Sequence, residues 1–228
     1  MRIIFVRHGH PDYANDCLTP LGMKHAEAAA ERLRHEGIRQ IFSSTCGRAL
    51  ETAAQTAALL NLPVERCDFM REIHWGTAEG EALYEDGHPW GTADKMVSEG
   101  LSILEADWDS REPFHRNLVV DNVHVMANAM DEWLSTLGYV REGLYYRVTR
   151  PVQDTIAVFS HGGASAAMLS HLFNLPFPFV CKTMGPDYTA VTIAVLPDAP
   201  GALVSPHFEL LNDARHIREL PSSNFFGN

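Results

Sequence analysis

The sequence predicts a three-layer α/β sandwich with a mainly parallel sheet and one antiparallel edge strand. Short apolar runs rich in β-branched residues, such as 3–6 and 155–159, are typical of strands buried on both faces. Segments with apolar residues at the helical period alternate with these runs, as in parallel α/β proteins. Of the 228 residues, 46% are hydrophobic and 21% charged, which excludes disordered and disulfide-scaffold classes. We expect a single domain covering residues 1–228.

The first half of the chain supplies two strand–helix units. After the strand at 3–6, Thr19 is placed to cap a helix that has Pro20 at its first position and Gly37 as its stop signal. A short strand at 41–43 then leads to a helix rich in Ala and Leu over residues 47–60.

The second half begins with a segment that differs from the rest in composition and periodicity. Residues 80–118 contain Trp90 and Trp108, many Asp, Glu and Gly residues, and little periodicity. We interpret them as an irregular or partly helical insertion that lies over the site and sets substrate choice. Regular patterns then return as a helix at 123–137, a strand at 155–159, a helix of small residues at 163–173, and strands at 190–196 and 207–211.

Charge and targeting signals narrow the choice of partners. The chain has 18 Lys and Arg against 29 Asp and Glu, a net charge of −11, so we expect no nucleic-acid partner. The apolar run at the N-terminus is too short for a signal peptide, and no apolar run is long enough to span a membrane. Four scattered cysteines are typical of reduced thiols, which favours the cytoplasm.

Two predicted strands end in a histidine followed by glycine. The first runs into His8-Gly9 and the strand at 155–159 runs into His161-Gly162. Sites of α/β sheets lie at the carboxyl ends of the strands, so the two histidines meet if these strands are neighbours. A glycine after each histidine lets a ligand approach the backbone closely.

Two arginines are predicted to lie at the same edge of the sheet. Arg7 precedes His8, and Arg48 follows the strand at 41–43 at the start of a helix, where free amides and the helix dipole favour an anion. Guanidinium groups match phosphate oxygens. In a chain of net charge −11, such a local cluster of cations predicts phosphate binding.

With these residues in place, the chain resembles the histidine phosphatase superfamily, which includes the phosphoglycerate mutases. The matching motifs span almost the whole chain in the expected order. They are RHG at 7–9, LTxxG at 18–22, SxxxRAxxTA at 44–53, ExxxGxxEG at 72–80, SHGG at 160–163 and a C-terminal NDxxH stretch at 212–216.

The resemblance implies metal-independent hydrolysis of a small phosphorylated substrate, with no cofactor. His8 is then the nucleophile that forms a phosphohistidine, and Glu72 protonates the leaving oxygen and activates water. The implied phosphate-binding residues are Arg7, Arg48, His161 and Gly162. Because Glu72 must be protonated while His8 is neutral, we expect a pH optimum near or below neutrality.

The sequence departs from the family pattern at two places. His10 stands where many relatives have Glu, and it is either a residue at the rim of the substrate site or an exposed bystander. Relatives often bind phosphate through an Asn six residues after the nucleophile. Position 14 is Ala14 here, so we assign this contact to Asn15 only if the loop absorbs one residue.

Several roles and functions stay open at this stage. Trp75 either raises the pKa of Glu72 by apolar contact or fills the core, and His216 is predicted to make a structural hydrogen bond. Mutase-type phosphoryl transfer is the alternative activity, although ExxxGxxEG resembles phosphatase-like members more than the glycolytic mutases. A binding or regulatory module without turnover is the alternative of another class.

Overall fold

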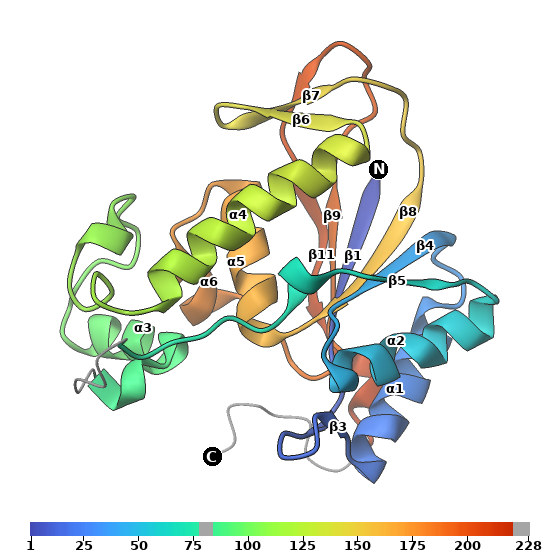
Figure 1. The fold of residues 1–228 in the computed structure, drawn as a ribbon, viewed down its shortest axis with the longest axis horizontal. Helices are drawn as coiled ribbons and strands as arrows, with labels where there is room; N and C mark the ends of the chain where they lie inside the picture. The colour runs from blue at the N-terminus through green and yellow to red at the C-terminus, as the bar shows by residue number, and fades with distance from the viewer. Residues whose placement is uncertain (78–83, 221–228) are drawn as a thin grey trace.

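A six-stranded sheet forms the centre of the protein (Figure 1). The computed structural model describes residues 1–77 and 84–220. Across the sheet the strand order is β11-β9-β1-β8-β4-β5. These strands are β1 (Arg2–Arg7), β4 (Ile38–Ser43), β5 (Val64–Arg66), β8 (Thr155–Ser160), β9 (Val191–Val195) and β11 (His207–Asp213).

The sheet is mainly parallel, as predicted. β1, β8, β4 and β5 run in one direction, and β9 is antiparallel to β1. We expected the antiparallel strand at the edge, but β9 lies one position inside it because β11 pairs with its outer side. Residues 196–206 connect β9 to β11, and the two strands pair in antiparallel fashion, so β11 extends the sheet by one more strand.

Helices cover both faces of the sheet, which makes three layers (Figure 1). Alternation along β1 shows the two sides: Ile3 and Phe5 enter a core with α4 and α5, and Ile4 and Val6 enter a core with α1 and α2. The predicted fold class is therefore confirmed. The helices are α1 (Pro20–Leu33), α2 (Gly47–Leu60), α3 (Pro89–Ser98), α4 (Val119–Thr136), α5 (Gly162–Phe173) and α6 (Phe177–Thr183).

Local signals in the sequence explain the helix ends. The Thr19 hydroxyl accepts the Gly22 N–H at 3.1 Å, so Thr19 caps α1 as predicted. Helices α2 and α5 end at Asn61 and Asn174, whose φ values of 53° and 54° are left-handed. Within residues 1–77 and 84–220, no helix is long and apolar enough to cross a lipid bilayer.

The predicted insertion is partly helical and well packed. Residues 80–83 lie outside the described residues, as do positions 78–80 of the ExxxGxxEG motif. The rest of the insertion forms a 3-10 turn at Tyr84–Gly87, helix α3 and a second 3-10 turn at Trp108–Ser110. Trp90 and Trp108 are only 7% and 8% exposed, and α3 packs against α6. This part of the insertion therefore belongs to the core on the α4–α5 side.

Short strands outside the main sheet were missed by the sequence analysis. Strands β6 (Tyr139–Glu142), β7 (Tyr145–Val148) and β10 (Leu203–Val204) form a three-stranded sheet, and β2 (Pro11–Asp12) pairs with β3 (Cys17–Leu18). Tyr139 and Tyr146 of this small sheet are fully buried and pack in the core on the α4–α5 side.

The packing of α1 on the sheet predicts the effect of one truncation. Leu33 is fully buried in the core between α1, α2 and the sheet. We expect Leu33→Ala to lower the free energy of unfolding by about 2–5 kcal/mol, because the cavity only partly collapses. Urea unfolding measures this loss. Val125→Ala on α4, where the valine is 68% exposed, is the control and should change it by less than about 0.5 kcal/mol. Equal losses would mean that the assigned core is wrong.

Candidate active site

The carboxyl ends of β1 and β8 bring His8 and His161 together. The two strands are parallel neighbours, with Arg7 in register with Ser160. The two imidazole rings lie 5.2 Å apart between centroids, at an interplanar angle of 62°. His8 is 1% exposed and His161 is fully buried. Two histidines 153 positions apart in the sequence thus share one buried site, as their places at the strand ends predicted.

The surroundings of His8 fix its protonated nitrogen. Nδ1 lies 2.7 Å from the Gly9 carbonyl oxygen, which can only accept, so Nδ1 carries the hydrogen and Nε2 keeps its lone pair. Burial, and next the Arg7 charge, hold the pKa of His8 well below its usual range. A neutral imidazole with a free Nε2 is suited to nucleophilic attack at neutral pH.

A close backbone approach sets the position of the loop after His8. A Cβ on Gly9 would lie 2.5 Å from the Gly22 carbonyl oxygen, and one on Gly22 would lie 2.1 Å from the His10 carbonyl oxygen. The Gly9 N–H donates to the Thr52 hydroxyl of α2 at 3.0 Å. The loop after β1 is therefore held between the first turn of α1 and helix α2.

His161 places a ring N–H donor in the site, and this donor has no partner among the described residues. The Ser44 hydroxyl oxygen accepts the Cys46 N–H at 3.2 Å, so its own hydrogen can go to His161 Nε2 at 2.8 Å. This leaves the hydrogen of His161 on Nδ1, a buried atom without a partner among the described residues. Burial and the neighbouring His8, Arg48 and Arg7 hold the pKa of His161 well below its usual range. His161 is thus a neutral donor inside the site.

Both predicted arginines lie at this edge of the sheet. Arg7 donates to the Pro186 carbonyl oxygen at 2.9 Å, and its guanidinium lies 4.2 Å from the centre of the Tyr188 ring. Arg48, in the first turn of α2, forms an ion pair with Asp16, while its buried Nε has no partner in the part of the chain that the structure describes. At 3% and 9% exposure, Arg7 and Arg48 hold two positive charges largely out of water.

Glu72 enters the site from the loop that follows the 3-10 turn Asp68–Met70. The Ser160 hydroxyl donates to the Met70 carbonyl oxygen at 2.7 Å, which ties this loop to the end of β8. The Glu72 carboxylate accepts the N–H groups of Ala164 at 2.8 Å and Ile73 at 3.1 Å, and that of Gly163 at 3.4 Å. Two of these amides belong to the first turn of α5.

Two opposing effects act on the Glu72 carboxyl. Burial raises its pKa, while the amides of α5 and the Arg7 charge favour the ionised form and lower it. Burial is the larger effect, so the pKa of Glu72 lies above its usual value. A raised carboxyl pKa beside a neutral imidazole is the pairing that general acid catalysis with a histidine nucleophile requires.

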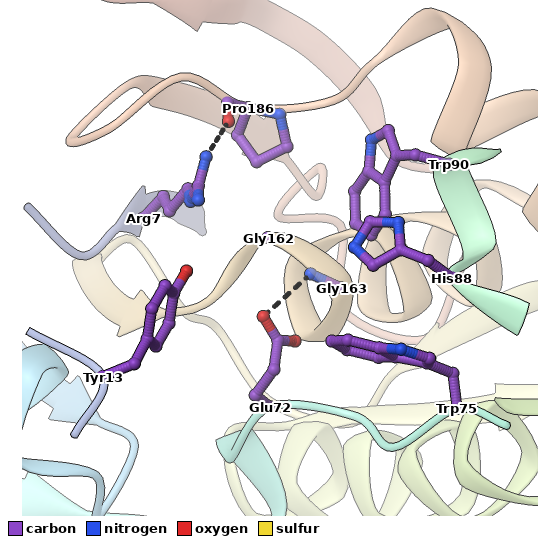
Figure 2. A pocket seen from close by; sticks show the side chains of 9 residues that line it. All are labelled: Arg7, Tyr13, Glu72, Trp75, His88, Trp90, Gly162, Gly163 and Pro186. Atoms are coloured by element: carbon purple, nitrogen blue, oxygen red, sulfur yellow. Dashed lines mark hydrogen bonds between the residues drawn. The ribbon is translucent and has the colours of Figure 1, made fainter. Parts of the chain in front are cut away.

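A pocket of about 390 Å³ opens beside these groups (Figure 2). In Figure 2 a dashed line joins Glu72 to Gly163 near the centre, Trp75 lies to the right of Glu72, and Arg7 lies to its upper left across the pocket. Trp75 lines the same pocket as Glu72 and also packs on the core, so its core role is confirmed and its effect on the pKa of Glu72 stays a prediction. The full lining is Arg7, Tyr13, Glu72, Trp75, His88, Trp90, Gly162, Gly163 and Pro186.

Two expected contacts take a different form. Asn15 is exposed, and its amide donates to Asp12 Oδ2 at 2.8 Å within the β2–β3 turn, so its contact with phosphate stays a prediction. His10 is partly buried: Nδ1 lies 3.0 Å from the Thr19 hydroxyl, and the ring lies 5.4 Å from that of Tyr188. His10 is therefore not an exposed bystander.

Sequence reasoning missed several residues that support the site. Asp16 orients Arg48 and also accepts the Gly47 N–H at 2.8 Å, and Tyr188 stacks under Arg7. No local pattern marks either residue, because both lie on connections whose course depends on the whole fold. Ser44 could have been found, since it begins the SxxxRAxxTA motif.

Comparison with known sequences finds a family that resembles the first part of the chain. A sequence model described as the histidine phosphatase superfamily (branch 1) matches residues 3–99, which contain Arg7, His8, Arg48 and Glu72. The match thus covers the part of the chain that holds four of the predicted site residues. A relative from Yersinia pestis named "Probable phosphoglycerate mutase GpmB" is 28% identical over 123 residues, which are 46% of this chain. The chain spans 57% of the length of that curated relative.

Solved structures of phosphatases share the fold. A mycobacterial glucosyl-3-phosphoglycerate phosphatase superposes with a TM-score of 0.63 and 23% identity, over 92% of this chain and 98% of its own. A phosphoserine phosphatase variant from Entamoeba histolytica, in complex with phosphoserine, superposes with a TM-score of 0.62 and 20% identity. The superposition covers 95% of this chain and 98% of that phosphatase. The likeness thus extends over the half of the chain that follows the sequence match.

Two further histidines, one fully and one partly buried, lie behind the site. His25 of α1 is fully buried, and neither ring nitrogen has a partner among the described residues. His216 makes the predicted structural hydrogen bond, with Nε2 3.1 Å from the Thr189 hydroxyl. Burial lowers the pKa of each to about 4. Both are therefore neutral in the folded protein at neutral pH.

These histidines predict acid sensitivity. In the unfolded chain they bind protons below about pH 6.5, whereas in the folded protein they do so only near pH 4. Their contribution to stability is present above pH 6.5 and is lost as the pH falls from 6.5 to 4. For His25 we expect a loss of about 1–3 kcal/mol. Urea unfolding between pH 7 and 4.5 measures it. His25→Leu should reduce the slope, and an unchanged slope would contradict the assignment.

Proposed function

We propose that this chain is a metal-independent phosphatase of the histidine phosphatase superfamily that hydrolyses the phosphomonoester of a small metabolite through a phosphohistidine on His8. The main support is a set of buried donors around His8: the guanidinium of Arg7, with Arg48 Nε and His161 Nδ1, neither of which has a partner within residues 1–77 and 84–220. Buried donors without partners cost free energy unless a ligand satisfies them, and a phosphoryl dianion has the matching charge and acceptors.

The first step transfers the phosphoryl group to the enzyme. The lone pair of His8 Nε2 forms a bond to phosphorus, and the bond from phosphorus to the ester oxygen breaks with its electron pair going to that oxygen. Protonated Glu72 gives its proton to the departing oxygen, so a neutral alcohol leaves. The hydrogen bond from Nδ1 to the Gly9 carbonyl oxygen holds the ring in the attacking tautomer.

The second step returns the enzyme to its starting state. The Glu72 carboxylate takes a proton from water as the water oxygen bonds to phosphorus and the P–N bond breaks, which releases phosphate and neutral His8. Through both steps Arg7, Arg48 and His161 balance the charge on the non-bridging oxygens. Gly162 follows His161 and lines the pocket beside Arg7, where the absence of a side chain leaves room for the phosphoryl group.

Residues 80–118 are the proposed specificity segment. His88 and Trp90 of this segment line the pocket on the side away from Tyr13, so they are placed to contact the alcohol part of a substrate (Figure 2). The structural relatives act on small phosphorylated compounds, glucosyl-3-phosphoglycerate and phosphoserine, as their names state.

Mutase-type transfer is a second candidate, favoured by the name of the Yersinia relative. It would use the same residues, with a second acceptor hydroxyl in place of water. Interconversion of 2- and 3-phosphoglycerate that depends on a bisphosphorylated primer, at a rate above that of phosphate release, would support it over hydrolysis.

Phosphate release from p-nitrophenyl phosphate with excess EDTA tests the proposal. We expect turnover that persists with the chelator and falls at least about a thousandfold in His8→Ala, because the nucleophile is lost. Between pH 5 and 8 the rate should fall as the pH rises, since the raised pKa of Glu72 keeps this acid protonated only on the acidic side. Activity lost with EDTA would contradict the metal-independent mechanism. Labelling of His8 in a single turnover without further hydrolysis would indicate a binding module.

The start of α5 allows a sharper test of Glu72. A Cβ on Gly163 would lie 2.5 Å from Ile73 Cγ1 and 2.8 Å from Glu72 Oε1, so Gly163→Ala must displace the carboxylate. We expect kcat to fall about a hundredfold in Gly163→Ala, because the carboxylate is moved away from the ester oxygen. A kcat equal to that of the wild type would exclude this position for the general acid.

A further inference from the structure

The pocket beside the phosphoryl site has an aromatic wall, formed by Trp75, His88 and Trp90 (Figure 2). The Trp75 and His88 rings lie 4.7 Å apart at 78°, and those of His88 and Trp90 lie 5.4 Å apart at 40°. Tyr13 and Pro186 complete the apolar lining on the side of Arg7. At about 390 Å³, the pocket has room for a group of one or two rings.

The reaction places the carbon part of the substrate in this pocket. The ester oxygen must lie within reach of the Glu72 carboxyl, which lines the pocket together with Gly163 at the start of α5. The phosphoryl group lies on the side of Arg7 and His8. Whatever the ester oxygen carries therefore extends toward Trp75, His88 and Trp90.

The pocket offers little to a charged group. Arg7 and Glu72 are the charged side chains among the described lining residues, and both are used in the reaction. His88 is uncharged at neutral pH, because burial lowers its pKa. A carboxylate placed against this wall would lose its hydration without gaining a cation, which is costly. An aromatic or branched apolar group would be transferred out of water against matching rings.

We infer that the substrate is a phosphomonoester whose alcohol is uncharged and carries an aromatic or bulky apolar group, bound against Trp75, His88 and Trp90. This inference rests on the proposed phosphatase function and deepens it. It sets the chain apart from relatives whose named substrates, such as phosphoserine, carry a carboxylate beside the phosphoryl group.

Three esters with alkyl leaving groups test the inference. Benzyl phosphate carries an uncharged ring, its para-carboxylate carries the same ring with a charge, and 3-phosphoglycerate carries a carboxylate without a ring. Because all three release an alkyl alcohol, differences in leaving-group acidity do not decide the result. We expect kcat/KM for benzyl phosphate to exceed that for each of the other two by about tenfold or more.

Variants of Trp75 show whether the wall causes the preference. Trp75→Ala should lower kcat/KM for benzyl phosphate about tenfold, mainly through KM, and should lower that for 3-phosphoglycerate less. Trp75→Phe should keep most of the preference. Trp75→Arg should shift it toward the para-carboxylate, which separates specificity from general damage. Tyr145→Ala, an aromatic residue that is 50% exposed on β7, is the control and should change neither.

The outcomes separate this inference from the function on which it rests. Hydrolysis of all three esters with 3-phosphoglycerate preferred would overturn the inference and leave the phosphatase proposal intact. Unchanged ratios in Trp75→Ala and Trp75→Arg would do the same. No hydrolysis of any ester by the folded wild-type protein would overturn both.

Discussion

The parallel pairing of β1 with β8 is the constraint on which the site depends. It places Arg7 beside Ser160, so the next residue of each strand, His8 and His161, enters the same buried space. β4 pairs with the other side of β8, which brings Ser44 to His161 and starts α2 with Arg48 close by. Three parallel strands thus deliver Arg7, His8, Arg48 and His161 from one edge of the sheet.

Holding these groups together requires compensation, and the structure supplies it with few carboxylates. Asp16 pairs with Arg48, and the Arg7 guanidinium is held by the Pro186 carbonyl oxygen and the face of Tyr188. Neither histidine needs a counter-charge, because burial keeps both neutral. In a chain of net charge −11, two guanidinium groups and a neutral imidazole donor gathered at this one place favour an anionic group there.

The sequence predicted the parts of the site that lie directly at strand ends. Arg7, His8, Arg48 and His161 could be placed because buried strands are short apolar runs whose ends are easy to find. Glu72 was found through the family motif, since it lies on a loop without periodic signal. Asp16, Tyr188 and the sheet of β6, β7 and β10 could not be predicted, because their positions depend on contacts between distant segments. The sequence also did not predict that β9 lies one position inside the edge of the sheet, because its pairing with β11 produces no pattern in its own residues.

Three backbone amides donate hydrogen bonds to Glu72, so the protonation state of this carboxyl affects how strongly the start of α5 is held. An ionised carboxylate accepts hydrogen bonds more strongly than a protonated carboxyl, and two of the amides belong to the first turn of the helix that His161 precedes. In the proposed reaction Glu72 is ionised while the phosphoryl group is on His8. The hydrogen bonds to the start of α5 are then strongest during the lifetime of the covalent intermediate. They are weakest in the free enzyme, where Glu72 is protonated. Stiffness at this corner of the protein would alternate with each turnover.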